Sequence, residues 1–214
     1  MNRLLRTLAA SSLLAAAPVF VAPAFAAPVV FSINPFAGST ADPNDGVRTI
    51  FGGVERQLPS FDIAVDRFVF DPVVFGLAAG LQVVNGLVSA LPDGGVNVVI
   101  LQSTDNDNNP ATAFNAGAAA NLIASAIDDD GAGFFVYFNS VLAVNRLVYS
   151  SNLNSATADL SILARINSPT GAQAIASLPA FTAANFAVPE PETWTLALLG
   201  LGGAVLTRRR VGPG

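Results

Sequence analysis

A run of oxygen-bearing side chains from Asp105 to Asn109 is the clearest candidate for a metal site in the sequence. Hard cations such as Ca²⁺ prefer carboxylate and amide oxygens, and Asp105 and Asp107 are the best ligands of the run. As an EF-hand loop starting at Asp105, however, the run has Pro110 in place of the required glycine and Ala116 in place of the bidentate glutamate. A solvated turn rich in Asn and Asp is the favoured interpretation, and an irregular Ca²⁺ site is the alternative.

Three further aspartates are the candidates for acid–base chemistry. A strand over residues 61–65 would place Asp62 and Asp66 on one face, and Asp71 follows shortly after. Paired carboxylates can hydrolyse glycosidic bonds. Two aspartates on the wet face of a strand more often serve only solubility, and no flanking motif favours catalysis. A carboxylate-based hydrolase is therefore the last of the functional hypotheses.

The composition excludes most other catalytic chemistry. The chain of 214 residues has no cysteine, no histidine and no lysine. It therefore lacks disulfides, the commonest general base and metal ligand, and the residue that forms Schiff bases. We expect a protein that is not an enzyme and that needs no cofactor, with Ca²⁺ as the one open question. Residues 27–187 carry a net charge of −8, so we expect no nucleic-acid partner.

Hydrophobic alternation predicts a β-rich body. Residues 81–84 and 87–90 flank Asn85-Gly86, a dipeptide that favours a two-residue hairpin turn. With residues 96–101 these segments predict a three-stranded antiparallel meander. Further strands are expected within residues 29–33, 61–70, 134–138, 147–150 and 159–166.

One amphipathic helix is expected at residues 112–127, where apolar side chains recur at helical spacing opposite Asn115, Asn121 and Ser125. A short helical stretch is expected near residues 173–178. The fold class is accordingly α+β, with a mainly antiparallel sheet covered by one main helix. A β-sandwich with an inserted helix is the alternative.

The first 26 residues have the layout of a secretory signal peptide. Arg3 and Arg6 precede an apolar stretch of about 14 residues from Leu8 to Val21, and the tripeptide Ala24-Phe25-Ala26 follows it. The stretch is short for a membrane span of about 20 residues. We therefore expect cleavage after Ala26 and export of one domain, residues 27–187.

Residues 188–214 form a second addressing segment. Pro189-Glu190-Pro191 precedes the apolar run 194–207, which as a helix is about 21 Å long and short against a hydrocarbon core of about 30 Å. Arg208, Arg209 and Arg210 then resist crossing, so they should remain cytoplasmic while the body lies outside. A weak apolar segment with a basic stop suits a transient membrane anchor, and an ordinary single-pass anchor is the alternative.

This arrangement resembles the PEP-CTERM sorting signal of exopolysaccharide-producing Gram-negative bacteria. The resemblance rests on the order and spacing of Pro189-Glu190-Pro191, the glycine-interrupted apolar run and Arg208–Arg210. It implies recognition of the Pro-Glu-Pro motif by exosortase, a membrane-embedded cysteine transpeptidase. It also implies removal of the tail at the inner membrane and delivery to the cell surface or extracellular matrix.

The leading functional hypothesis is therefore a non-enzymatic surface or matrix protein that associates with exopolysaccharide in a biofilm. The alternative is a module that binds Ca²⁺ or polysaccharide.

Overall fold

The computed structural model of the chain describes residues 28–40, 45–77 and 80–189. The expected signal peptide, residues 1–26, lies outside the described residues. So does the sorting segment beyond Pro189. The expected exported domain is thus the part of the chain whose structure can be followed.

The described residues include a central seven-stranded sheet in the order β2-β9-β8-β7-β6-β5, with β3 also paired to β9. Its three longest strands, β7, β8 and β9, were expected from the sequence: β7 and β8 are longer than the predicted runs, and β9 is one residue shorter. The strands are β2 (Ile50–Phe51), β3 (Arg56–Leu58), β5 (Val83–Gly86), β6 (Val98–Leu101), β7 (Gly133–Asn139), β8 (Val144–Ser150) and β9 (Leu160–Ile166).

The expectation of a mainly antiparallel sheet is wrong, because the sheet is mixed. Strands β7, β8 and β9 are antiparallel neighbours. The pairs β5–β6, β6–β7, β2–β9 and β3–β9 are parallel. Every residue of β6 and β7 is buried, as is usual for parallel strands whose two faces are both covered. An antiparallel strand with one face in water alternates apolar and polar residues, but a strand that is buried on both faces does not. The sequence of such a strand therefore does not show which direction its neighbours run.

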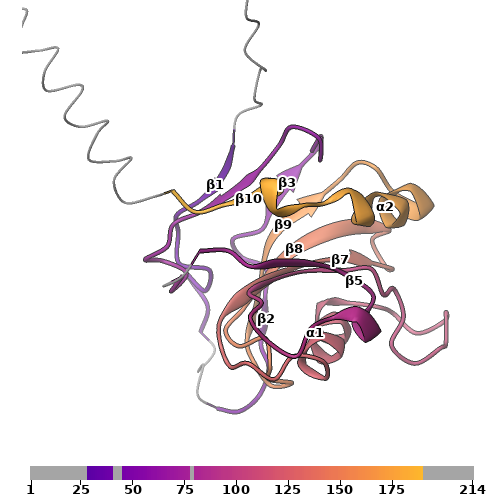
Figure 1. Cartoon of the computed structure of the whole chain (residues 1–214), viewed down its shortest axis with the longest axis horizontal. Coiled ribbons are helices and arrows are strands. Elements are labelled where there is room, and N and C mark those ends of the chain that lie inside the picture. The colour runs from indigo at the N-terminus through magenta and orange to yellow at the C-terminus, as the bar shows by residue number, and fades with distance from the viewer. Residues whose placement is uncertain (1–27, 41–44, 78–79, 190–214) are drawn as a thin grey trace, which may run out of the picture.

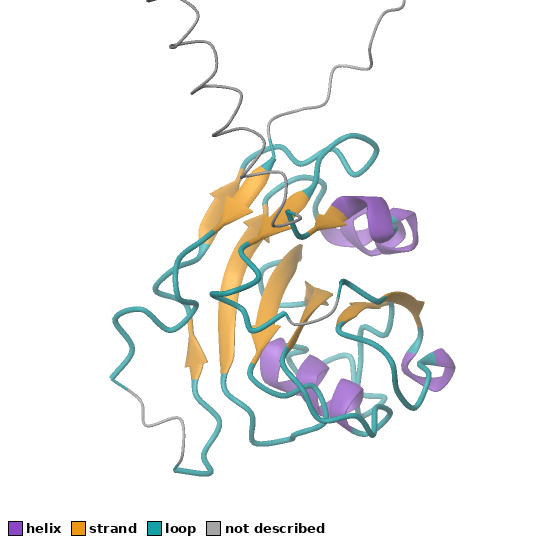
Figure 2. Ribbon diagram, turned by 60° about the vertical axis from the view of Figure 1, so that its left-hand side comes forward, coloured by secondary structure: helices purple, strands orange, loops and turns teal. Residues whose placement is uncertain are grey.

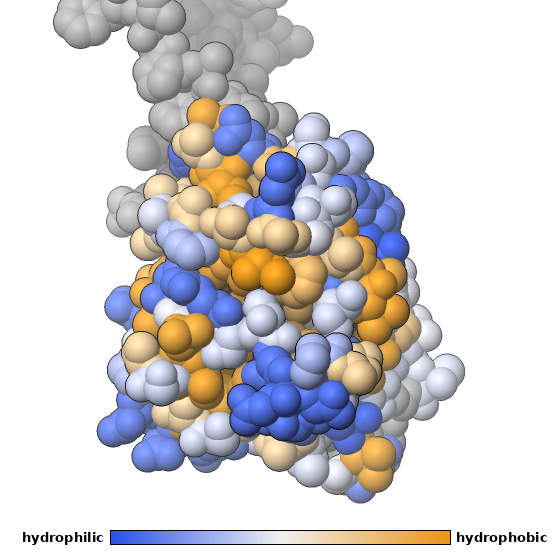
Figure 3. Space-filling view, turned by 90° about the vertical axis from the view of Figure 1, so that its right-hand side faces the viewer, coloured by the Kyte–Doolittle hydropathy of each residue, from blue (hydrophilic) through white to orange (hydrophobic). Residues whose placement is uncertain are grey.

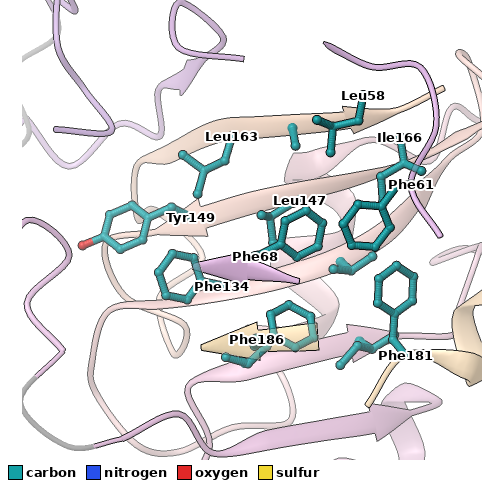
Figure 4. Packing of buried hydrophobic residues seen from close by; sticks show 14 of the residues in the cluster. Leu58, Phe61, Phe68, Phe134, Leu147, Tyr149, Leu163, Ile166, Phe181 and Phe186 are labelled. Carbon is teal, nitrogen blue, oxygen red and sulfur yellow. The ribbon is translucent and has the colours of Figure 1, made fainter. Parts of the chain in front are cut away.

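A second, smaller sheet packs on one face of the central sheet. Its strands β1 (Val29–Phe31), β4 (Phe68–Phe70) and β10 (Phe186–Ala187) are parallel, with β4 in the middle. The interface is rich in phenylalanine, as Figure 4 shows for Phe68, Phe134 and Phe186. The ring of Phe70 stacks on that of Phe134 with centroids 3.9 Å apart. The β-sandwich alternative is therefore correct in that two sheets face each other.

The helices cover both sides of the central sheet (Figures 1 and 2). Helix α1 (Ala116–Ala124) packs on the face opposite the small sheet, against side chains such as Val99 and Phe135. Helix α2 (Gly171–Ser177) lies on the side of the small sheet. Short 3₁₀ helices complete the fold: η1 (Val88–Ala90), η2 (Leu178–Ala180) and η3 (Ala183–Asn185).

The main amphipathic helix is confirmed, although it is shorter than expected. It begins after Asn115, whose side-chain oxygen accepts the N–H of Ala118 at 3.1 Å, a typical N-cap. Phe114, which fitted the helical pattern, instead lies in the preceding loop and is buried. The mostly β architecture with few helices agrees with the α+β class.

The expected antiparallel meander is absent from residues 81–101. Neither Asn85 nor Gly86 has a positive φ angle, so the pair forms no hairpin turn. Both belong to β5, which runs parallel to β6. The Asn85 amide instead donates to the carbonyls of Leu178 and Phe181, each at 2.9 Å. The dipeptide thus serves a long-range contact, which local turn preference does not reveal.

The strand expected over residues 61–65 is also wrong. This segment is a turn in which the N–H of Asp66 donates to the carbonyl of Asp62 at 2.7 Å. Phe61 is buried and stacks on Phe68 at 4.5 Å, while Asp62 remains exposed. The segment alternates apolar and polar residues because the Phe61 ring enters the core while its polar neighbours stay at the surface. A turn of this kind has the same apolar–polar pattern as a strand.

We predict that Phe70→Ala lowers the free energy of unfolding by about 3–5 kcal/mol, because it leaves a cavity between the two sheets. Phe70 is fully buried and contacts rings from both sides of the interface. Urea unfolding of the processed protein measures the loss. The control is Val141→Ala, whose side chain is 69% exposed, with an expected change within about 0.5 kcal/mol. Equal effects of the two substitutions would contradict the proposed role of the interface.

Candidate functional site

The acidic loop forms a series of Asx turns. Oδ1 of Asp105 accepts the N–H of Asp107 at 2.9 Å, and Oδ1 of Asp107 accepts the N–H of Asn109 at 3.0 Å. Asn109 repeats the pattern with Ala111 at 3.1 Å. The backbone N–H of Asp107 holds the pKa of Asp105 below its ordinary value. The loop is thus built as the solvated turn that the sequence favoured, with one oxygen of each aspartate already used.

Ca²⁺ binding at Asp105 and Asp107 stays a prediction. Ca²⁺ requires six to eight oxygen ligands, so two exposed aspartates need several further donors. Within residues 28–40, 45–77 and 80–189, no group of three or more acidic, histidine or cysteine side chains is placed to share an ion. Backbone carbonyls and water would have to supply the remaining ligands.

If Ca²⁺ binds the native loop, thermal unfolding must shift with the ion. A concentration 100-fold above the dissociation constant raises the free energy of unfolding by about 2.7 kcal/mol, so the melting temperature in Ca²⁺ exceeds that in EDTA. Asp107→Asn should abolish this difference. Asp45→Asn, in another exposed Asx turn, should preserve it. Superimposable melts of the wild type would rule out the Ca²⁺ site.

The three aspartates considered for catalysis are occupied by backbone hydrogen bonds. Oδ2 of Asp66 accepts the N–H of Asp62 at 2.8 Å, and Oδ1 of Asp62 accepts the N–H of Ala64 at 2.9 Å. Oδ1 of Asp71 accepts the N–H of Val73 at 2.9 Å and begins the turn that follows β4. The turn therefore brings Asp62 and Asp66 together, and their carboxylates stabilise it.

A charged cluster that the sequence analysis missed lies on the central sheet. Tyr137, Arg146 and Arg165 stand directly opposite one another on β7, β8 and β9. Glu55, between β2 and β3, forms salt bridges with both arginines. Arg146 Nη2 lies 2.7 Å from Glu55 Oε1, and Arg165 Nε lies 3.2 Å from the same oxygen. The side chains of Arg146 and Glu55 are only 13% and 11% exposed. One carboxylate thus ties the β2–β3 segment to two central strands.

Tyr137 is buried beside these salt bridges. Its hydroxyl accepts a hydrogen bond from the side-chain amide of Asn139 at 2.9 Å. Burial raises the pKa of Tyr137 above its ordinary value, and the bond from Asn139 and the charge of Arg146 oppose this rise only in part. The tyrosine is therefore neutral at physiological pH and acts as a hydrogen-bonding partner within the sheet. One signal in the sequence was available: Arg146 and Arg165 interrupt otherwise apolar strands.

The arginines of the described body are engaged largely with its own acceptors. Besides Arg146 and Arg165, the Arg48 guanidinium donates to the carbonyls of Ser155, Ala158 and Gly117. Arg56 donates to the carbonyl of Val30 at 2.8 Å. On the face shown in Figure 3, hydrophilic and hydrophobic side chains alternate over short distances. These arginines stabilise the fold.

We predict that Glu55→Gln destabilises the protein by about 2–4 kcal/mol, because it leaves two partly buried guanidinium groups side by side without their counter-charge. The estimate stays below that for a fully buried pair, since the Arg165 side chain is 30% exposed. Urea unfolding at pH 7 measures the effect. Asp45→Asn removes an equal charge from an exposed turn and should change stability by no more than about 0.5 kcal/mol. A similar result for both variants would show that the cluster contributes little.

The Pro-Glu-Pro motif begins almost directly after the last strand of the body. β10 ends at Ala187, and Val188 and Pro189 come next, both half-buried. Pro189, the first residue of the expected Pro-Glu-Pro motif, is therefore in contact with the folded domain. Glu190 and Pro191 lie outside the described residues, as do Arg208, Arg209 and Arg210.

Residues 187–211 match the PEP-CTERM protein-sorting motif. The chain carries a PEP-CTERM sorting motif. The match confirms the sorting signal that the sequence indicated and includes the motif, the apolar run and the arginine stop. The motif indicates an exported protein that is processed by exosortase and has a transient C-terminal membrane anchor. Neither a curated protein nor a solved structure matches the chain.

Among residues 28–40, 45–77 and 80–189, no helix is both long enough and apolar enough to cross a membrane.

Proposed function

We propose that the exported body is a non-enzymatic component of the cell surface or extracellular matrix, released by exosortase and associated with exopolysaccharide in a biofilm. The observation that carries this proposal is the sorting motif at residues 187–211, which begins within the last strand of the folded body. A protein addressed in this way ends outside the inner membrane once its tail is removed. Its body then acts where secreted polysaccharide accumulates.

The chemistry of the body supports a structural role. The chain has no histidine, cysteine or lysine, so histidine bases, cysteine nucleophiles and lysine Schiff bases are missing from the sequence. Asp62, Asp66 and Asp71, the candidates for a catalytic pair, stabilise turns through hydrogen bonds with backbone N–H groups. The only glutamate of the body, Glu55, is bound by two arginines. The acidic groups of the body therefore have evident uses in the fold.

Composition also suits a durable extracellular component. Two sheets joined by phenylalanine packing form a large apolar core, which stabilises the domain without a disulfide. A surface with a net charge of −8 over residues 27–187 favours solubility. Association with an acidic polysaccharide would require a bridging cation, and Asp105 and Asp107 are the residues to which such an ion would bind.

The intact mass of the recovered protein tests this proposal. In a host with exosortase, we expect a polypeptide without the apolar run 194–207, recovered from the cell-surface or matrix fraction. In a host without exosortase, the same chain should retain the tail and sediment with the inner membrane. Replacing Pro189-Glu190-Pro191 by three alanines should reproduce the second result in the first host, whereas Asp45→Asn should be processed normally.

A polypeptide that keeps residues 194–210 and stays in the inner membrane of a normal host would contradict the sorting step. A processed protein that leaves no trace in the matrix fraction, and that is released entirely to the medium, would contradict the matrix role alone.

A further inference from the structure

The outer face of the small sheet holds an apolar groove. Along β1 and β4 the side chains alternate, so that Phe31, Phe68 and Phe70 enter the core while Val30 and Val69 point outward. A groove of about 690 Å³ lies over these outward residues, bounded by Pro72 and Val73. Val73 is 89% exposed and Val30 is 47% exposed. Aliphatic side chains of this exposure, gathered on one face, are typical of an interaction surface.

Both membrane-directed segments of the chain join the body at this groove. Pro28, the second residue after the expected signal cleavage site, lines it, and so does Pro189, the first residue of the sorting motif. β1 and β10 flank β4 in parallel register, so Pro28, before β1, and Pro189, after β10, lie at opposite ends of the small sheet and line the groove from two sides. The groove is therefore the part of the body nearest to whatever holds the tail.

The tether between the groove and the anchor is short. Trp194 follows Pro189 by five positions, so the chain between them reaches at most about 18 Å. A domain of this size has a radius of gyration of about 15 Å, so the tether is shorter than the body is wide. With the apolar run in the bilayer and Trp194 at its interface, the face around Pro189 is held close to the lipid headgroups.

The charge of this face also suits a membrane. The acidic side chain that lines the groove is Asp71, and its Oδ1 accepts the N–H groups of Val73 and Val74 at 2.9 and 3.3 Å. The body as a whole is strongly acidic, so an anionic bilayer repels most of its surface. An apolar face with one hydrogen-bonded carboxylate is the part that can approach lipid at the least cost.

We propose that the outer face of the β1–β4–β10 sheet is a docking surface for the lipid bilayer, on which the precursor rests until its tail is cut. This docking rests on the anchoring of the tail in the proposed function. It holds Pro189 beside the membrane, where a membrane-embedded enzyme acts. Once the tail is removed, the tether is lost and the body is free to leave.

Single cysteines test this proposal, because the native chain has none. The precursor with its tail is purified from a host without exosortase and reconstituted in phosphatidylethanolamine–phosphatidylglycerol vesicles. A charged, membrane-impermeant maleimide then labels Val73→Cys in the groove or Val141→Cys in the β7–β8 loop, which is 69% exposed. Relative to the tail-free processed protein in buffer, we expect Val73→Cys to react at least about five-fold more slowly and Val141→Cys to react unchanged.

Three results would overturn the docking surface. Equal reaction of the two cysteines in vesicles would show that the face does not touch lipid. Protection of Val73→Cys only when exosortase is added to the vesicles would identify the enzyme as the occupant. Protection that also appears in the tail-free protein and rises with its concentration would identify a second copy.

Vesicle flotation separates this inference from the proposed function. A precursor that floats with the vesicles but leaves Val73→Cys reactive disproves the docking surface and retains the anchor. A precursor that does not float disproves both. Circular dichroism of each variant confirms that its fold is intact.

Discussion

The central sheet is buried on both faces, and the rest of the structure follows from this constraint. Strands β6, β7 and β8 present apolar side chains in both directions, so each face needs its own cover. Helix α1 supplies one cover, and the small sheet with α2 supplies the other. The aromatic contacts between Phe70, Phe75 and Phe134 fix how the small sheet sits. Because the small sheet includes the first and last described strands, this packing also decides where the chain enters and leaves the body.

Several polar groups inside the two layers form hydrogen bonds and ion pairs that join distant segments. Glu55 binds arginines that follow it by 91 and 110 positions. Asn85 and Asn185 each bridge two backbone carbonyls far away in sequence. A buried polar group without a partner is costly, so these bonds specify one arrangement among the many that an apolar core would tolerate. They compensate for the lack of disulfides in an exported domain.

The sorting motif adjoins the last strand of the fold. β10 pairs with β4 through Phe186 and Ala187, and the matched motif starts at Ala187. The position of the small sheet therefore sets where the chain leaves the folded body toward its anchor.

The elements of the fold differ in how far local sequence could predict them. The long strands β7 to β9 and helix α1 were recognisable, since each is a continuous or periodic apolar run. Strand direction was not, because a strand buried on both faces shows no alternation. Asn85-Gly86 has the residue types of a hairpin turn, but its amide is used by carbonyls some 90 positions away. Asp105 and Asp107 were placed correctly in an exposed loop, whose Asx turns arise from neighbouring residues alone.

The sequence by itself determined that the protein is exported and processed at its C-terminal tail. A sorting motif is a contiguous segment that a processing enzyme recognises in an extended chain, so no fold is needed to identify it. Only the tertiary structure decided the pairing of Glu55 with Arg146 and Arg165, and the placement of Pro28 and Pro189 along one groove. A hydrophobic pattern records that a residue is buried, but it contains no information about which distant residue lies against it.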